Sequence, residues 1–172
     1  ICQNGFNCNI LAYDPYISNQ RFLKFNAKKT KLNDLLFESD IVSVHIPLTK
    51  ETYNSIDKNF FSKMKKGSYF ITTSRGSIHN EDDLATFLKN GHLSGAGLDV
   101  WEKEPPNSDH KLLKMQNVVA TPHMAGVTVD SRKKMSEFVA NQLLNILRGG
   151  IPERPVNKEI LSLFKLKLSK II

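Results

Sequence analysis

The stretch that decides the fold is residues 64–106, MKKGSYFITTSRGSIHNEDDLATFLKNGHLSGAGLDVWEKEPP. It contains an apolar run at Tyr69–Thr72, a helix candidate at Asn80–Leu88 and a second apolar run at Gly97–Trp101. Asn80 is a suitable N-cap, and the three acidic residues after it fill the first turn, where the helix dipole favours negative charge. A strand, a helix and a second strand in this order predict one β-α-β unit with parallel strands.

The same pattern continues on both sides of this stretch. Further apolar runs, rich in Ile, Val and aromatic residues, lie at Cys8–Tyr13, Ile41–Ile46 and Val118–Ala120. The runs mostly do not alternate with polar residues, which is typical of strands buried on both faces of a parallel sheet. Other helices are expected at Leu32–Glu38, Asp57–Met64 and Thr128–Arg148. The alternation predicts an α/β fold with a doubly wound parallel sheet.

The chain ends in a long helix and an ambiguous tail. The apolar residues of Thr128–Arg148 fall on one stripe, and the Gly149-Gly150 pair ends the helix. In the tail, a helical face would contain Ile160, Leu161, Phe164, Leu168 and Ile171, whereas a strand would contain Phe164, Leu166 and Leu168. We expect residues 1–150 to form one domain and residues 151–172 to be a C-terminal tail that returns toward a domain outside this chain.

Composition excludes several classes of protein. The chain has 172 residues, 40% hydrophobic and 24% charged, which suits one soluble globular domain. No apolar run approaches the roughly 18 residues of a membrane span, so no membrane partner is expected. The two cysteines, Cys2 and Cys8, form no disulfide framework, and we therefore expect a cytoplasmic protein.

The net charge of +7 has two interpretations. It could indicate binding to nucleic acid. However, the lysines are scattered and are not interleaved with the aromatic residues that single-strand binders use for stacking. We favour a lysine-rich surface without a nucleic-acid partner.

Residues capable of chemistry stand at the end of every apolar run. In chain order they are Asp14; His45 and Pro47; Thr73, Ser74 and Arg75; Asp99 with Glu104 after it; and Thr121 with His123. If the five runs are parallel neighbours, these groups converge on one cleft, because open parallel sheets bind ligands beyond the carboxyl ends of their strands. Each residue alone is also compatible with a surface or structural role. No clustered His and Cys residues suggest a metal site.

Asp14 has two interpretations of its own. A carboxylate after the strand can accept hydrogen bonds from the adenosine ribose of NAD and would repel the 2′-phosphate of NADP. In the Asp14-Pro15 pair it is equally suited to a turn. A glycine-rich loop should lie roughly 20 residues before such an acid. The only glycine before Asp14 is Gly5, which we interpret as a helix terminator. We expect a truncated start that lacks the first strand and the glycine loop, with roughly 130 residues upstream.

Four stretches resemble the D-isomer-specific 2-hydroxyacid dehydrogenases. They are ILAYDPY (10–16), SDIVSVHIPLTKET (39–52), the stretch 64–106 and NVVATPHMAGVT (117–128), and the resemblance extends over nearly all of residues 1–157. It implies a Rossmann-type NAD-binding domain without its first strand and glycine loop. It also implies that Arg75 binds the substrate carboxylate, that His123 is the general acid/base and that Glu104 is its partner.

The resemblance further implies that Asp99 lies near the nicotinamide carboxamide and that Pro47, Thr73 and Gly126 line the cofactor. With the residues at the strand ends, the expected cofactor-binding set is Asp14, His45, Pro47, Thr73, Ser74, Arg75, Asp99, His123 and Gly126.

The expected function is an NAD-dependent oxidoreductase that interconverts a D-2-hydroxy acid and its 2-keto acid, of the 3-phosphoglycerate, glyoxylate or hydroxypyruvate type. A histidine suits the proton transfer, and an arginine suits a carboxylate. We expect a homodimer, and a chain that is inactive as an isolated fragment. The alternatives are an NAD-binding protein resembling the C-terminal binding protein corepressors, or a non-functional gene fragment. Formate dehydrogenases resemble the chain less, because they carry an amide at the position of Glu104.

Overall fold

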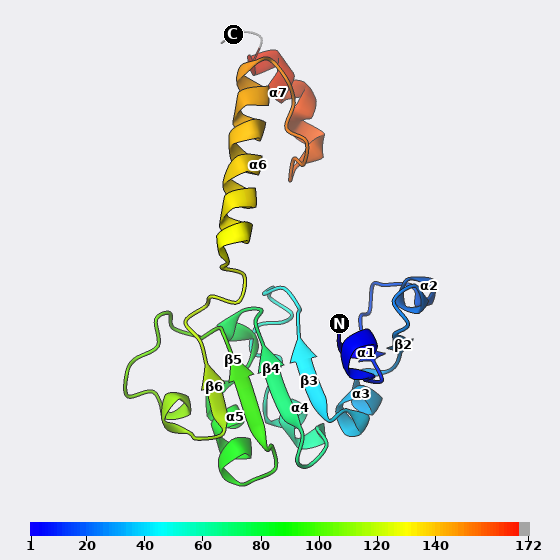
Figure 1. Cartoon of the computed structure of the whole chain (residues 1–172), viewed down its shortest axis with the longest axis vertical. Helices are drawn as coiled ribbons and strands as arrows, with labels where there is room; N and C mark the ends of the chain where they lie inside the picture. Colours follow the sequence, from blue (N-terminus) through cyan, green and yellow to red (C-terminus); the bar gives the residue numbers. More distant parts are fainter. Residues whose placement is uncertain (169–172) are drawn as a thin grey trace. The chain divides into compact units, whose positions relative to one another are not determined.

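The computed structural model describes residues 1–168 (Figure 1). The strands are β1 (Leu11–Ala12), β2 (Lys28–Lys29), β3 (Ile41–Val44), β4 (Tyr69–Thr72), β5 (Gly95–Leu98) and β6 (Val118–Ala120). The α-helices are α1 (Cys2–Phe6), α2 (Asn19–Leu23), α3 (Leu32–Glu38), α4 (Lys58–Lys63), α5 (Glu81–Lys89), α6 (Val129–Leu147) and α7 (Leu161–Leu168). Three 3₁₀ helices are η1 (Gly76–Ile78), η2 (Lys111–Lys114) and η3 (Lys158–Ile160). The chain divides into two compact units, Ile1–Ala125 and a second that begins at Gly126.

A four-stranded parallel sheet forms the centre of the first unit. Its strand order is β3-β4-β5-β6, and the four arrows in Figure 1 point the same way. Val42 is in register with Phe70, and Phe70 with Ala96. The carboxyl ends of all four strands therefore lie at one edge. The predicted Rossmann-like parallel α/β fold is confirmed.

The first apolar run is not a neighbour in this sheet. β1 pairs in parallel with β2, with Leu11 opposite Lys28, in a separate two-stranded sheet. The condition that all five runs are parallel neighbours is therefore met by the other four runs and not by this one. β1 has only two residues, and its partner is a pair of exposed lysines that carries no apolar strand pattern.

Only one face of the four-stranded sheet is buried. Phe70 on β4 packs with Phe61 of α4, at 5.2 Å between ring centroids, and Leu84 of α5 is buried in the same core. On the other face, Tyr69 is 50% exposed and Val119 is 72% exposed. The expected burial of both faces is wrong for this chain, because α4 and α5 place their apolar residues on one side only.

Several boundaries differ from the expectation: β1 and β3 are shorter than the apolar runs Cys8–Tyr13 and Ile41–Ile46 that contain them. β5 spans Gly95–Leu98 and not Gly97–Trp101, because Trp101 leaves the sheet and donates its indole N–H to the carbonyl of Thr121, at 3.1 Å. Gly5 lies inside α1 and does not end it. The left-handed residue that ends α1 is Asn7, at φ 53°, and its N–H binds the carbonyl of Cys2.

Two helices of the first unit, α4 and α5, begin with a side-chain cap. α3 has the expected bounds. The carboxylate of Asp57 accepts hydrogen bonds from the N–H groups of Asn59 and Phe60 at the start of α4. The side chain of Asn80 accepts from the N–H of Asp83 in α5. These caps satisfy N–H groups that have no partner within the helix.

The second unit consists of α6, η3 and α7. Thr128 caps α6 by accepting from the N–H of Ser131, and Gly149 follows the helix at φ 83°. The tail forms helix α7, so the helical alternative is correct for Leu161–Leu168, while Ile171 lies outside the described residues. The expected domain division after residue 150 stays a prediction. Within residues 1–168, no helix combines the length and apolarity that crossing a membrane requires.

Candidate active site

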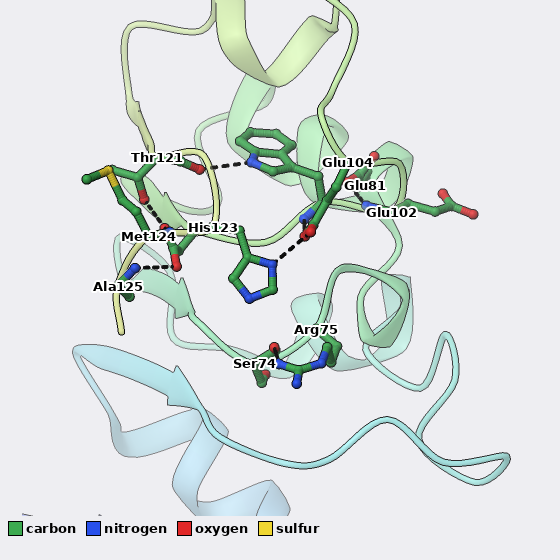
Figure 2. A network of polar contacts seen from close by, with 11 residues as sticks. Ser74, Arg75, Glu81, Glu102, Glu104, Thr121, His123, Met124 and Ala125 are labelled. Atoms are coloured by element: carbon green, nitrogen blue, oxygen red, sulfur yellow. Dashed lines mark hydrogen bonds and ion pairs between the residues drawn. The ribbon is translucent and has the colours of Figure 1, made fainter. Parts of the chain in front are cut away.

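His123 lies in the loop that follows β6. Its backbone is left-handed, at φ 52°, a conformation that costs free energy for a residue other than glycine. Its ring nitrogen Nδ1 lies 2.7 Å from Oε2 of Glu104 (Figure 2). Since a carboxylate only accepts, the imidazole N–H donates in this pair. The structure therefore brings together two of the three predicted catalytic residues.

Glu104 is held by two donors. Besides His123, the backbone N–H of Trp101 donates to its Oε1 at 3.1 Å. The hydrogen bond from His123, followed by that from Trp101, lowers the pKa of Glu104 despite an opposing effect of burial, and the charge of Arg75 acts in the same direction. The carboxylate is therefore charged at neutral pH and stabilises positive charge on the imidazole.

Asp99 holds the loop that carries His123. One carboxylate oxygen accepts from the hydroxyl of Thr121 at 2.5 Å and from the N–H of Met124 at 2.8 Å, and the other accepts from the N–H of Ala125 at 2.8 Å. Burial alone would raise the pKa of Asp99, but these hydrogen bonds lower it overall. Its contacts thus bracket the left-handed His123 (Figure 2). Its expected contact with the nicotinamide carboxamide stays a prediction.

Arg75 follows β4 and is exposed. One guanidinium N–H donates to the carbonyl of Ser74 at 2.6 Å. The other guanidinium N–H groups make no hydrogen bond within the described residues, so they can bind a ligand carboxylate through the planar fork. In the view of Figure 2, Arg75 is drawn below the ring of His123 and Glu104 above it.

Gly76 and Trp101 connect the loop of Arg75 to the loop of Glu104. Neither residue was predicted from the sequence to have a role in the site. A Cβ atom on Gly76 would lie 1.9 Å from the carbonyl carbon of Trp101, so only glycine allows this close approach. Trp101 is 3% exposed. The available signals were the Arg75-Gly76 pair and the single tryptophan of the chain.

The remaining predicted residues at β3 and β4 also lie beyond the strand ends. The ring of His45 contacts the hydroxyl of Ser43 at 2.8 Å, and the carbonyl of Pro47 accepts from the hydroxyl of Thr52 at 2.6 Å. Ser74 donates to the carbonyl of Val44 at 3.3 Å, and Thr73 is exposed.

Gly126 begins the second unit, and a Cβ there would meet nothing within 4 Å. Among residues 1–168, no three His, Cys, Asp or Glu side chains gather as a metal site would require.

Asp14 lies apart, after β1 of the two-stranded sheet. Its Oδ1 accepts from the N–H groups of Tyr16, at 2.8 Å, and Ile17, at 3.1 Å, so the carboxylate does form a turn. Its Oδ2 makes no hydrogen bond to any described residue. That oxygen can still accept from a ribose hydroxyl, and the two interpretations of Asp14 are compatible.

Residues 1–125 match the sequence model of the D-isomer specific 2-hydroxyacid dehydrogenase, NAD binding domain. The chain belongs to this family. A glyoxylate reductase of Thermofilum pendens is 45% identical over 98% of the chain and 50% of its own length. A D-3-phosphoglycerate dehydrogenase of Archaeoglobus fulgidus is 41% identical over 82% of the chain and 27% of its own length.

A solved structure gives the same result. The NAD-complexed form of a D-isomer specific 2-hydroxyacid dehydrogenase from Lactobacillus delbrueckii ssp. bulgaricus superposes with a TM-score of 0.80 at 32% identity, covering 87% of this chain and 49% of that one. The chain thus spans about half the length, or less, of the relatives it matches.

Proposed function

We propose that the whole protein is an NAD-dependent oxidoreductase that interconverts a D-2-hydroxy acid and its 2-keto acid. The observation that carries this proposal is the 2.7 Å contact between His123 and Glu104. The charge of Arg75 acts on the same carboxylate, and most of its guanidinium N–H groups make no hydrogen bond within residues 1–168. The named relatives favour a small acid of the glyoxylate or 3-phosphoglycerate type. A homodimer, a cytoplasmic location and inactivity of the isolated chain remain predictions.

The three side chains suit the two ends of a 2-keto acid. The fork of Arg75 binds the carboxylate and places positive charge beside the C2 carbonyl. His123, with Nδ1 bound to Glu104, presents Nε2 as the proton donor to the carbonyl oxygen. In the oxidative direction the neutral imidazole accepts the hydroxyl proton, and Glu104 stabilises the imidazolium that forms.

The residues present fit a nicotinamide dinucleotide. Asp14 offers Oδ2 to the adenosine ribose, as an NAD site requires. His45, Pro47 and Thr73 lie at the carboxyl ends of parallel strands, where dinucleotides bind in this fold class. When bound, the reduced cofactor supplies the hydride that C2 accepts. That hydride and the proton from His123 together convert the keto acid into the hydroxy acid.

The test is oxidation of NADH by the whole protein with glyoxylate, hydroxypyruvate or phosphohydroxypyruvate. We expect turnover with at least one of them, and a loss of roughly 10²–10⁴-fold in kcat for His123→Ala. A protein that binds NADH but reduces none of a panel of 2-keto acids would contradict the proposal and favour an NAD-dependent binding protein.

A further inference from the structure

The loop that carries Glu104 has almost no anchor in the core. Between the buried residues Trp101 and Leu112, every residue of segment 102–110 is exposed or half-buried. Apolar packing therefore does not determine the shape of this segment. Its position relative to His123 depends on polar contacts.

One carboxylate makes polar contacts with both ends of segment 102–110. Oε1 of Glu81 accepts from the backbone N–H of Glu102 at 2.9 Å (Figure 2), and Oε2 lies 3.0 Å from Nε2 of His110. The side chain of Glu81 is only 10% exposed. A charged group this deeply buried is stabilising only when its oxygens are bound, as they are here.

Rigid elements surround this carboxylate. Glu81 begins α5, whose Leu84 and Leu88 are buried in the core. The ring of His110 packs edge-on against Trp101, with 5.5 Å between the centroids. The backbone N–H of the same Trp101 donates to Oε1 of Glu104.

We infer that Glu81 is a positioning residue: it connects both ends of segment 102–110 to α5 and thereby holds Glu104 against His123. The inference rests on the proposed function only for the role of the pair in catalysis. The geometric part, in which Glu81 maintains the contact between Glu104 and His123, holds whatever the pair does.

The test uses Glu81→Ala in the whole protein and follows the carboxyl carbon of Glu104 by ¹³C NMR against pH. Hydrogen bonds from His123 and Trp101 keep the pKa of Glu104 below its usual value. If the loop loses its anchors, those bonds weaken and the pKa of Glu104 should rise toward the value of an ordinary glutamate. Glu81→Gln keeps an oxygen for the N–H of Glu102, so it should give a smaller rise and remain informative if the alanine variant does not fold.

Asp82→Ala is the matched control. Asp82 occupies the same helical turn and pairs with Lys111, just outside segment 102–110. The Asp82→Ala variant loses the same favourable interaction with the helix dipole as the Glu81→Ala variant does. The pKa of Glu104 should stay unchanged in this variant.

The kinetic readout separates positioning from general damage. For keto-acid reduction we expect Glu81→Ala to lower kcat by about 10–100-fold, with little change in KM, because the side chain of Arg75 is held by Ser74 and makes no hydrogen bond to Glu81 or to segment 102–110. Combined with Glu104→Gln, Glu81→Ala should cause no further loss, since the pair it positions is already removed.

Two results would overturn the inference: an unchanged pKa of Glu104 in folded Glu81→Ala, or losses in kcat that multiply in the double variant. A different result separates it from the proposed function. If the wild-type protein reduces no 2-keto acid, yet the pKa of Glu104 rises in Glu81→Ala, the positioning role is supported and the proposed reaction is not.

Discussion

At the scale of single residues, the Glu104–His123 pair gives the most direct prediction. Because the carboxylate is charged at neutral pH, it favours the protonated imidazole that keto-acid reduction requires. Glu104→Gln keeps the shape and removes the charge. The fall of reductive kcat/KM with rising pH should therefore shift toward acid, and the rise of oxidative kcat/KM should shift the same way. Profiles measured in both directions check this.

Glu102→Gln serves as the control for this experiment, because Glu102 is exposed and only its backbone N–H contacts the network. It should leave both profiles in place. Superimposable profiles for wild type and Glu104→Gln would mean that Glu104 does not tune His123, even though the two are in contact.

His79 predicts a dependence of stability on pH. It is 2% exposed, neither ring nitrogen has a partner within the described residues, and burial lowers its pKa to about 4, despite an opposing effect of Glu81. The unfolded chain takes up this proton near the usual pKa of 6.5 and the folded chain does not. Stability is therefore lost as pH falls from about 6.5 to about 4, by on the order of 3 kcal/mol.

Urea unfolding at pH 7 and pH 5 measures this loss. His79→Leu, which removes the titrating group from an apolar site, should be less sensitive to the change of pH than the wild type. The exposed His45 provides the control, and His45→Ala should keep the wild-type difference. If wild type and His79→Leu lose equal stability between the two pH values, the buried histidine is not the cause.

At the scale of elements, the contact between η1 and the segment after β5 depends on one glycine. A methyl group on Gly76 would meet backbone atoms of Trp101 and Glu102 at 1.9 to 2.4 Å. Backbone atoms cannot rotate away as a side chain can. Gly76→Ala should therefore lower the free energy of unfolding by roughly 1–3 kcal/mol or more, because two elements must separate. Urea denaturation gives the value.

Gly126→Ala is the comparison for this variant, since a methyl group there meets nothing within 4 Å and stability should change little. Equal stability of Gly76→Ala and the wild type would mean that Trp101 can move away from η1 at no cost.

At the scale of the whole molecule, the isolated chain exposes a large apolar surface. Tyr69 and Val119 lie on the uncovered face of the sheet, and Met135 and Val139 are exposed on α6. Exposed apolar surface on either unit favours association. We expect residues 1–172 alone to self-associate at micromolar concentration and to bind NAD weakly or not at all, as light scattering and calorimetric titration would show.

Neighbouring valines on β6 test the cause. Val119 is exposed on the open face, whereas Val118 packs against the core. Val119→Lys should reduce self-association without unfolding the chain, and Val118→Lys should destabilise it. A monomeric wild-type chain with micromolar affinity for NAD would contradict the prediction.

Periodicity and motifs predicted much of this molecule. The bounds of β4, β6 and α3 agree with the predicted ones, because the apolar residues of each short stretch specify its local structure. β2 could not be predicted, since an exposed Lys28-Lys29 pair has no local preference that distinguishes it from a loop. The uncovered face of the sheet was also missed, because an apolar run does not reveal which of its faces is covered.

By itself, the sequence determined the family, the parallel α/β class and the residue types His123, Glu104 and Arg75, because each depends on local patterns and motifs. Only the tertiary structure decided that Asp99 supports the loop of His123, that Trp101 requires Gly76 and that Glu81 anchors segment 102–110. These contacts join residues far apart in the chain. Their geometry depends on how strands and loops pack, which no stretch of sequence specifies locally.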